Sequence, residues 1–266
     1  MPKMTSGKLK TMSNFLIVLR FFLIFTTAVS FNSHADLTAS EVNTVLAAHN
    51  NVRSTVSPTA ANMTRLVWDQ NLAAVAQNYA NQCNFAHNAN RNANYAALSP
   101  NTGQVGENIF VTTQGRAQAL NGSGSAVALW AAEAVDYTFA TNSCGAGKVC
   151  GHYTQVVWAN TLRVGCGITQ CPSIIGLPST FNNGQLVICN YNPAGNFIGQ
   201  SPYIAGTPGS QCPAGLPNVV DGLCSPAASA AQTATVPGLP WLGAGVLGLC
   251  LMAMMIKLSG KGKVKI

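Results

Sequence analysis

The amino-acid sequence predicts an α+β or three-layer domain, in which helices surround a small sheet and disulfides close the fold. Helical periodicity dominates the first part of the body, whereas short β-branched segments between Gly, Pro and Asn turns dominate the later part. Eight cysteines lie outside the apolar C-terminal tail, an even number that suits an exported, disulfide-bonded protein. Residues 36–203 are long enough to form one domain with its own core, and helices packed on a sheet give this fold class.

The first helix is predicted to begin after Thr38, because Thr38 and Glu41 form a capping box. In such a box the threonine hydroxyl and the glutamate carboxylate satisfy amide groups that the first helical turn leaves unpaired. The residues that should form the buried face then follow at helical spacing: Val42, Val45, Leu46 and His49.

Two further helices and two strands are predicted along the body. A second helix starts near Asp69, and one face carries Leu72, Val75, Ala76, Tyr79 and Cys83. A third helix over residues 125–137 carries one stripe formed by Ala126, Leu129, Trp130, Glu133 and Tyr137. Residues 163–168 and 185–191 are short and β-branched, which is typical of strands.

The net charge of +7 comes from the two ends of the chain rather than from the body. Eight of the 14 basic residues lie in residues 1–20 and 257–265, which leaves six basic against seven acidic residues in the body. A nucleic-acid-binding domain should carry its positive charge on the folded surface, so nucleic acid is disfavoured as a partner. No glycine-rich loop followed by Lys-Ser/Thr occurs, which also disfavours a nucleotide.

The N-terminal residues 1–35 are predicted to be a secretory signal peptide. A basic lead-in precedes the apolar stretch 21–29, and the small residues Ser33 and Ala35 fit a cleavage site before Asp36. The body would therefore be secreted or otherwise extracytoplasmic.

The C-terminal part divides into four segments. Residues 204–226 are a cysteine-containing extension, residues 227–236 a Pro/Ala/Ser/Thr linker, residues 237–256 an apolar helix, and residues 257–266 a basic tail. Twenty apolar residues just cross a bilayer core of roughly 30 Å, and the following lysines would stay on the cytoplasmic side. The Pro-Gly-Leu-Pro start and the basic end also resemble bacterial C-terminal sorting signals. We therefore expect either a transmembrane anchor or a sorting helix, and in both cases the membrane is a partner through residues 237–256.

Eight cysteines are expected to form disulfides outside the membrane: Cys83, Cys144, Cys150, Cys166, Cys171, Cys189, Cys212 and Cys224. Eight cysteines allow 105 pairings, so their spacing alone does not choose among them. A cysteine-based zinc site is disfavoured because no C-x-x-C pair is present.

Ionisable groups are rare in the body, and this makes each of them a candidate for chemistry. Three histidines and three glutamates remain after removal of the signal: His49, His87, His152, Glu41, Glu107 and Glu133. Glu41 is used by the capping box, and His49 on the apolar helix face is predicted to be a hydrogen-bonded core residue. Glu133 lies on a stripe that should be buried, so its carboxylate needs a partner, either an arginine, backbone amides, a histidine or a metal.

The remaining two histidines and two glutamates would suffice for an acid/base site or a divalent-metal site. No H-E-x-x-H motif supports this by spacing, and no G-x-S-x-G motif supports a serine nucleophile. Cys150 is close to His152 in the sequence, but in an even, exported set of cysteines it is predicted to be half of a disulfide.

Two long motifs give the chain a specific resemblance. The first is Gly151-His152-Tyr153-Thr154-Gln155-Val156-Val157-Trp158 and the second is Cys189-Asn190-Tyr191-Asn192-Pro193-Ala194-Gly195-Asn196. Both resemble motifs of the CAP superfamily (SCP domains), which includes cysteine-rich secretory proteins, venom allergens and plant pathogenesis-related proteins. Further matches occur in order at Gly106-Glu107-Asn108 and around Trp130 and Glu133.

This resemblance implies an α-β-α sandwich with a large open cleft. It also implies that His87, Glu107, Glu133 and His152 form one site, in which the histidines bind a divalent metal, often zinc, and the glutamates orient ligands or water. The pairing that the resemblance implies is Cys83–Cys166, Cys144–Cys150, Cys171–Cys189 and an additional Cys212–Cys224. The chain departs from the family at Asn88, where many relatives have serine, and in the Asn/Ala-rich insert 88–105, expected at the rim of the cleft.

The function expected from these observations is that of an exported, surface-tethered CAP domain. Its His/Glu cleft would bind a divalent metal and a lipid, sterol or peptide-like ligand. One alternative is a zinc-dependent hydrolase, a peptidase or esterase, in which Glu107 or Glu133 acts as general base. Another is a non-catalytic cell-surface interaction module.

Overall fold

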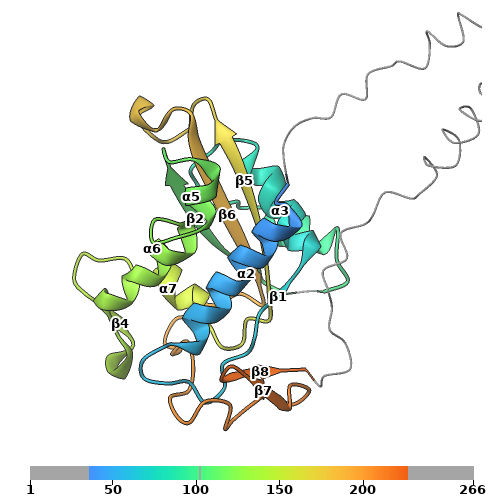
Figure 1. Ribbon diagram of the computed structural model, residues 1–266, viewed down its shortest axis with the longest axis vertical. Coiled ribbons are helices and arrows are strands. Elements are labelled where there is room, and N and C mark those ends of the chain that lie inside the picture. The colour runs from blue at the N-terminus through green and yellow to red at the C-terminus, as the bar shows by residue number, and fades with distance from the viewer. Residues whose placement is uncertain (1–35, 102, 227–266) are drawn as a thin grey trace, which may run out of the picture. The chain divides into compact units, whose positions relative to one another are not determined.

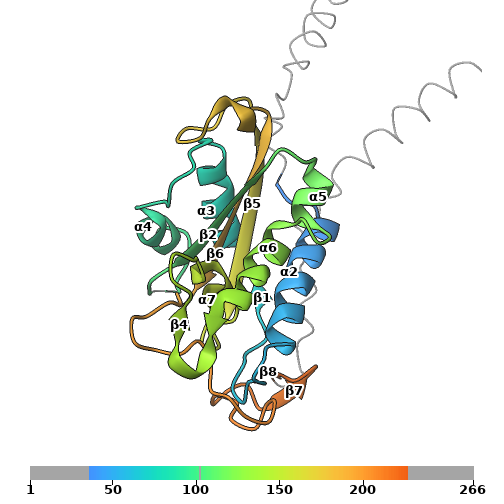
Figure 2. The same ribbon diagram turned by 90° about the vertical axis from the view of Figure 1, so that its left-hand side faces the viewer.

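A four-stranded sheet between two layers of helices organises the domain (Figures 1 and 2). The computed structural model describes residues 36–101 and 103–226. In chain order the helices are α2 (Ala39–Ser54), α3 (Gln70–Ala80), α4 (Arg91–Ala96), α5 (Arg116–Leu120), α6 (Ala126–Ala132) and α7 (Gly151–Val156). Short 3-10 helices are η1 (Glu133–Asp136), η2 (Phe139–Thr141) and η3 (Ser179–Phe181). The strands are β1 (Val67–Trp68), β2 (Gly106–Thr112), β3 (Tyr137–Thr138), β4 (Ser143–Cys144), β5 (Arg163–Cys171), β6 (Gly184–Asn192), β7 (Asn218–Val220) and β8 (Leu223–Ser225).

The main sheet has the strand order β1-β5-β6-β2, so β2 is an edge strand. β1 runs parallel to β5, whereas β5 with β6 and β6 with β2 are antiparallel. Figure 2 shows α3 on one side of this sheet and α2, α5 and α6 on the other. The architecture is therefore the α-β-α sandwich that was expected.

Helix α3 approaches the sheet closely because two glycines of β5 face it. A Cβ atom at Gly165 would lie 2.2 Å from the backbone nitrogen of Ala73, and one at Gly167 would lie 2.4 Å from the backbone of Gln77. Gln77 also bonds the backbone of Ile168 with both of its amide atoms. Glycine at these two positions lets the helix backbone rest on the strand.

The other face of the sheet carries the larger part of the core. Val164, Ile168, Val187 and Tyr191 of β5 and β6 pack there against the opposing helices, and the helical residues in this cluster include Val45, Trp130, Tyr153 and Val156. Alternate residues of the two strands thus pack against the two helix layers, because successive side chains of a strand point to opposite faces of the sheet.

The predicted starts of the first two helices are confirmed. Thr38 caps α2, and the backbone amide of Thr38 bonds the carboxylate of Glu41 at 2.8 Å, which completes the capping box. Asp69 caps α3 by accepting from the amides of Asn71 and Leu72. Glu41 has a second partner that the sequence did not indicate, since Arg116 lies 2.7 Å away and holds the pKa of this carboxyl down to about 2.

The predicted third helix is too long. The α-helix ends at Ala132, and the chain continues as the 3-10 helix η1 before it enters β3 at Tyr137. The structure also contains two elements that were not predicted, namely the helix α7 and the edge strand β2. The insert 88–105 holds α4, whose buried Tyr95 donates to Asp69 at 2.8 Å.

Two of the four expected disulfide pairings are wrong. The structure pairs Cys83 with Cys171 and Cys166 with Cys189, while Cys144–Cys150 and Cys212–Cys224 are as expected. Cys166 and Cys189 are directly opposite on β5 and β6. Cys166 and Cys171 are five positions apart on one strand, so they face opposite sides of the sheet. Only Cys171 faces the α3 side, where Cys83 follows the end of that helix.

Residues 204–226 fold back on the body. Cys224 is buried, its amide donates to Met63, and its carbonyl accepts from Arg65, so the β7–β8 hairpin is held beside the chain that follows α2. The expected signal 1–35, linker 227–236, transmembrane or sorting helix 237–256 and basic tail 257–266 lie outside the described residues. Within residues 36–226, no helix has the length and apolar character needed to span a bilayer.

Candidate functional site

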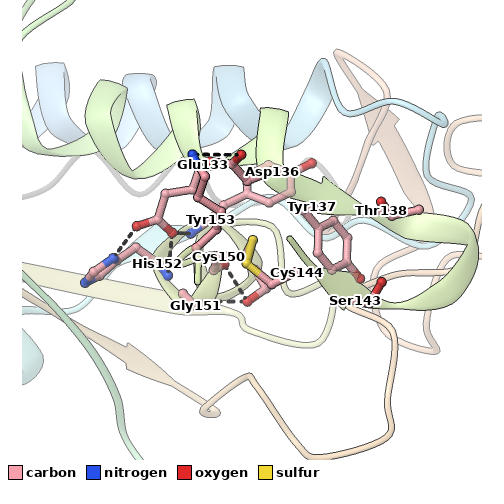
Figure 3. Close-up of a disulfide and its surroundings, with 12 residues drawn as sticks. Glu133, Asp136, Tyr137, Thr138, Ser143, Cys144, Cys150, Gly151, His152 and Tyr153 are labelled. Carbon is pink, nitrogen blue, oxygen red and sulfur yellow. Dashed lines mark hydrogen bonds and ion pairs between the residues drawn. A yellow bond between two sulfur atoms is a disulfide. The ribbon is translucent and has the colours of Figure 1, made fainter. Parts of the chain in front are cut away.

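The first half of the site is a pair formed by Glu133 and His152 (Figure 3). Glu133 is the first residue of η1 and His152 lies in the first turn of α7. Nδ1 of His152 lies 2.6 Å from Oε1 of Glu133, and Oε2 of Glu133 accepts from the backbone amides of His152 at 3.0 Å and Tyr153 at 3.1 Å. The residue preceding α7, Cys150, provides no side-chain cap, so Glu133 caps this helix instead.

The prediction that Glu133 needs a partner is therefore confirmed, and it has two kinds, a histidine and backbone amides. The imidazole of His152 is also stacked on Trp130, with ring centroids 6.2 Å apart and an angle of 16° between the planes. The disulfide Cys144–Cys150 anchors the start of α7 to the β3–β4 hairpin (Figure 3). His152 is thus held by Trp130 of α6 and Glu133 of η1, and the disulfide anchors the start of the helix that carries it.

The second half of the site is a pair formed by His87 and Glu107. His87 follows α3, and Glu107 is the second residue of β2. Nδ1 of His87 lies 2.9 Å from Oε1 of Glu107, which also accepts from the backbone amide of Asn88 at 2.8 Å. The side chain of Glu107 is fully buried, whereas that of His87 is 59% exposed.

The two pairs repeat one arrangement. In each, Nδ1 of a histidine bonds a glutamate, and the same glutamate accepts from the backbone amide of the next residue. A neutral imidazole that donates through Nδ1 presents an unprotonated Nε2, which is a metal-binding atom. Among the described residues neither Nε2 has a hydrogen-bond partner, so both remain available to a ligand.

The edge strand β2 connects the two pairs. Glu107 and Asn108 are consecutive, so their side chains point to opposite faces of the sheet. Glu107 holds His87 on the α3 side, while Asn108 donates to the carbonyl oxygen of His152 at 3.1 Å on the α7 side. Each predicted pair is therefore linked to one of two consecutive residues of β2, the His87–Glu107 pair through Glu107 itself and the His152–Glu133 pair through Asn108.

His49 belongs to the core, as predicted, and it is connected to the site through the hydroxyl of Tyr191, which also bonds Asn108. It is fully buried, with Nδ1 at 2.8 Å from the carbonyl oxygen of Val45 and Nε2 at 2.9 Å from the hydroxyl of Tyr191. Burial lowers the pKa of His49 to about 4 and raises the pKa of Tyr191, so both are neutral. The sequence did not indicate the roles of Asn108 and Tyr191, although both lie within the motifs that carry the resemblance.

The donor set for a metal consists of two imidazole nitrogens. In the described part of the chain, no group of three or more His, Cys, Asp or Glu side chains is arranged to hold a metal ion. Zinc sites of catalytic type have three protein ligands, and each ligating histidine donates a hydrogen bond from its other ring N–H to a carboxylate or carbonyl. Here both histidines have such a carboxylate partner, but a third protein ligand is not present among the described residues.

A groove of about 470 Å³ lies beside the start of α7. It runs past the Cys144–Cys150 disulfide, and Gly151, next to His152, is part of its wall. Its rim is apolar and open to solvent, because Val149, Phe197 and Ile198 are exposed there. None of the four His/Glu residues lines this groove.

Comparison with known proteins supports a single family. The family model described as the cysteine-rich secretory protein family (CAP) matches residues 46–191. The chain is 42% identical to peptidase inhibitor 16 of Bos taurus over 71% of the chain, but it spans only 37% of that relative. It is 38% identical to pathogenesis-related protein 1B of Nicotiana tabacum over 69% of the chain and 94% of the relative.

Solved structures agree with this match. The crystal structure of NaASP2 with Zn²⁺ superimposes with a TM-score of 0.55 at 26% sequence identity, covering 72% of this chain and 98% of the other. Three of the four disulfides, Cys83–Cys171, Cys144–Cys150 and Cys166–Cys189, lie within the residues that the family model matches.

Proposed function

Because the chain belongs to the cysteine-rich secretory protein (CAP) family, we propose that its two His/Glu pairs bind a divalent metal, zinc, through Nε2 of His87 and His152. The carboxylates of Glu107 and Glu133 carry this proposal, since each bonds Nδ1 and thereby fixes the orientation and the tautomer of its histidine. When bound, the metal would supply a positively charged centre to a ligand, and the histidines would supply its nitrogen ligands. A zinc-containing structure of a protein with the same fold is consistent with this assignment.

The affinity for zinc should be modest. Two protein nitrogens leave at least two positions of a tetrahedral ion to water or to a ligand. Such a site favours reversible binding, in which a ligand group can replace a water molecule.

The groove beside His152 is the proposed place for a lipid, sterol or peptide-like ligand. Apolar pockets with a few polar groups are the usual form of small-molecule sites. Here Val149, Phe197 and Ile198 supply apolar surface, while Thr154 and Asn196 supply polar groups within the same wall.

The hydrolase alternative has less support. A general base needs a carboxylate oxygen that can reach a water molecule in the site. Both oxygens of Glu133 and Oε1 of Glu107 already accept hydrogen bonds from histidine or backbone nitrogens, and Oε2 of Glu107 is buried. The geometry therefore favours binding over turnover. The inhibitory activity in the name of the bovine relative belongs to a protein of which this chain matches 37%, and it is not transferred.

The protein is extracytoplasmic, like the secreted relatives of this family, and its four disulfides suit an oxidising compartment. We also propose that residues 237–256 tether the protein to the cell surface, because their sequence is typical of a membrane anchor or a sorting helix.

Calorimetry with zinc tests the metal site. The full chain, purified without a histidine tag, should bind one zinc ion, and the His87→Ala/His152→Ala variant should lose this binding. Tyr95→Phe is the control, because it removes a buried hydrogen bond to Asp69 and leaves the contacts of both His/Glu pairs in place. Equal zinc uptake by the wild type and the double variant would exclude the site.

Mass spectrometry of co-purifying lipids tests the groove. The Phe197→Ser/Ile198→Ser variant should retain less lipid than the wild type. Val135→Ser is the matched control, since Val135 is 88% exposed and lies outside the groove. Equal lipid content in all three proteins, or none in the wild type from several hosts, would contradict a lipid in this groove.

Profiling of peptide and ester libraries with and without a chelator, against a Glu107→Gln control, tests the hydrolase.

A further inference from the structure

Three buried side chains beside the site have polar atoms without a partner. Oε2 of Glu107, Nδ2 of Asn88 and both amide atoms of Asn190 are buried, and none of them makes a hydrogen bond within the described residues. Asn190 is 0% exposed and Asn88 is 3% exposed. A buried polar group that stays unpaired costs about 1–3 kcal/mol, so four such atoms in one region indicate a binding site for a small polar molecule.

The sheet register and one backbone hydrogen bond place these three residues on the same side of the sheet. Asn190 of β6 is directly opposite Glu107 of β2, and directly opposite residues of an antiparallel pair share a face. Asn190 is also opposite Gly165, which faces α3, so this face is the α3 side. The backbone amide of Asn88 bonds Oε1 of Glu107 on the same side.

The chemistry of the four atoms selects the ligand. Glu107 and Asn190 offer acceptor oxygens, while the amides of Asn88 and Asn190 offer N–H donors. A cation would leave the N–H groups unpaired, and an anion would be repelled by the carboxylate. Water accepts from two donors and donates to two acceptors, which matches the set, and buried waters in proteins typically make about three such bonds.

We propose that a buried water molecule binds between Glu107, Asn88 and Asn190 and fixes the carboxylate of Glu107. The water donates to Oε2 of Glu107, so that Oε1 stays directed to Nδ1 of His87 and the amide of Asn88. Asn190 is then a positioning residue for His87 that acts through Glu107. The water site depends only on these buried atoms, and its effect on metal binding rests on the proposed function.

A crystal structure at about 1.5 Å resolution tests the water directly. The expected result is one density peak within hydrogen-bond distance of at least three of the four atoms. A peak with the short, regular coordination of a cation would overturn the proposal. So would direct bonds among Asn88, Glu107 and Asn190 with no peak between them.

The positioning role is tested by ¹⁵N NMR of the His87 ring in the absence of metal, so that a failure to bind zinc does not affect the outcome. The wild type should show protonated Nδ1 and unprotonated Nε2. Asn190→Leu should shift the ring towards the Nε2–H tautomer, whereas Asn190→Ser, whose hydroxyl can still bond water, should keep the wild-type spectrum. Val187→Ala on the same strand controls for a general loss of stability. An unchanged His87 spectrum in folded Asn190→Leu, or an equal change in Val187→Ala, would overturn the role of Asn190.

Discussion

The hydroxyl of Tyr191 lies 2.9 Å from Nε2 of His49 and donates a hydrogen bond to it. This direction follows from the other side of the ring, because Nδ1 of His49 must donate to the carbonyl oxygen of Val45. The oxygen of Tyr191 can then accept from Nδ2 of Asn108 at 3.3 Å, whose second proton goes to the carbonyl of His152. A single chain of hydrogen bonds thus runs from α2 through the sheet to the candidate site.

The first prediction concerns the pH dependence of stability. Burial, opposed in part by the bond to Val45 and aided by the charge of Arg53, lowers the pKa of His49 from 6.5 to about 4. The unfolded chain therefore takes up a proton at His49 between pH 6.5 and 4 that the folded chain does not bind. Stability from this group is complete above pH 6.5 and falls by about 3 kcal/mol on acidification to pH 4.

Urea unfolding of the wild type and His49→Gln at several pH values measures this effect. The difference between their free energies of unfolding should shrink as the pH falls from 6.5 to 4. A difference that stays constant over this range would show that His49 has an ordinary pKa. Glu41 does not interfere, because its pKa of about 2 places its loss of stabilisation between pH 4.5 and 2.

The second prediction concerns the link from Tyr191 to the site. Tyr191→Phe leaves Nε2 of His49 and one proton of Asn108 unpaired in the core, which should cost about 1–3 kcal/mol of unfolding free energy. The variant should also bind zinc more weakly, since Asn108 then holds the backbone of His152 less firmly. Tyr95→Phe is the matched control, because it loses a buried hydrogen bond to Asp69 outside this chain. If both variants weaken zinc binding equally, Tyr191 has no specific connection to the site.

The third prediction ranks two disulfides. Cys83–Cys171 closes a segment of 88 residues, and Cys144–Cys150 closes one of 6 residues. The loss of chain entropy in the unfolded state predicts that removing the first costs about 4–5 kcal/mol and removing the second about 2 kcal/mol. Urea unfolding of the two double Cys→Ala variants measures this order. The reverse order would show that the short bridge stabilises the folded state mainly by holding the start of α7.

Much of the local structure can be read from the sequence, because its signals are local. The capping box at Thr38 and the cap at Asp69 act within one turn, and both helices begin as predicted. The disulfide pairing cannot be read in the same way, because it depends on which face of β5 each cysteine occupies. Once the strand is known to include both Cys166 and Cys171, their odd separation excludes a shared face.

For the site as well, the candidate residues could be identified from the sequence, but their contacts could not. The four His/Glu residues stand out because charge is rare in the body, but the way they pair depends on contacts 19 and 20 residues apart in sequence. The helix α7 was missed because its cap is Glu133, from another element, rather than a residue just before it. Asn190 was missed because its importance depends on being opposite Glu107 across two strands.

The last prediction concerns the contact between α3 and the sheet. In Gly165→Ala the new Cβ would meet the backbone nitrogen of Ala73 at 2.2 Å and the carbonyl oxygen of Asp69 at 2.5 Å. Helix backbone cannot rotate away as a side chain can, so α3 must shift, at a cost near the upper end of the usual 1–3 kcal/mol for overpacking. Gly151→Ala is the matched control, because the nearest atom to its Cβ would be 3.9 Å away, and it should change stability by no more than about 0.5 kcal/mol. Urea midpoints measure both variants. Equal midpoints would show that α3 can move away from β5 without loss, and that the close packing beneath His87 and Asn190 does not hold the helix in place.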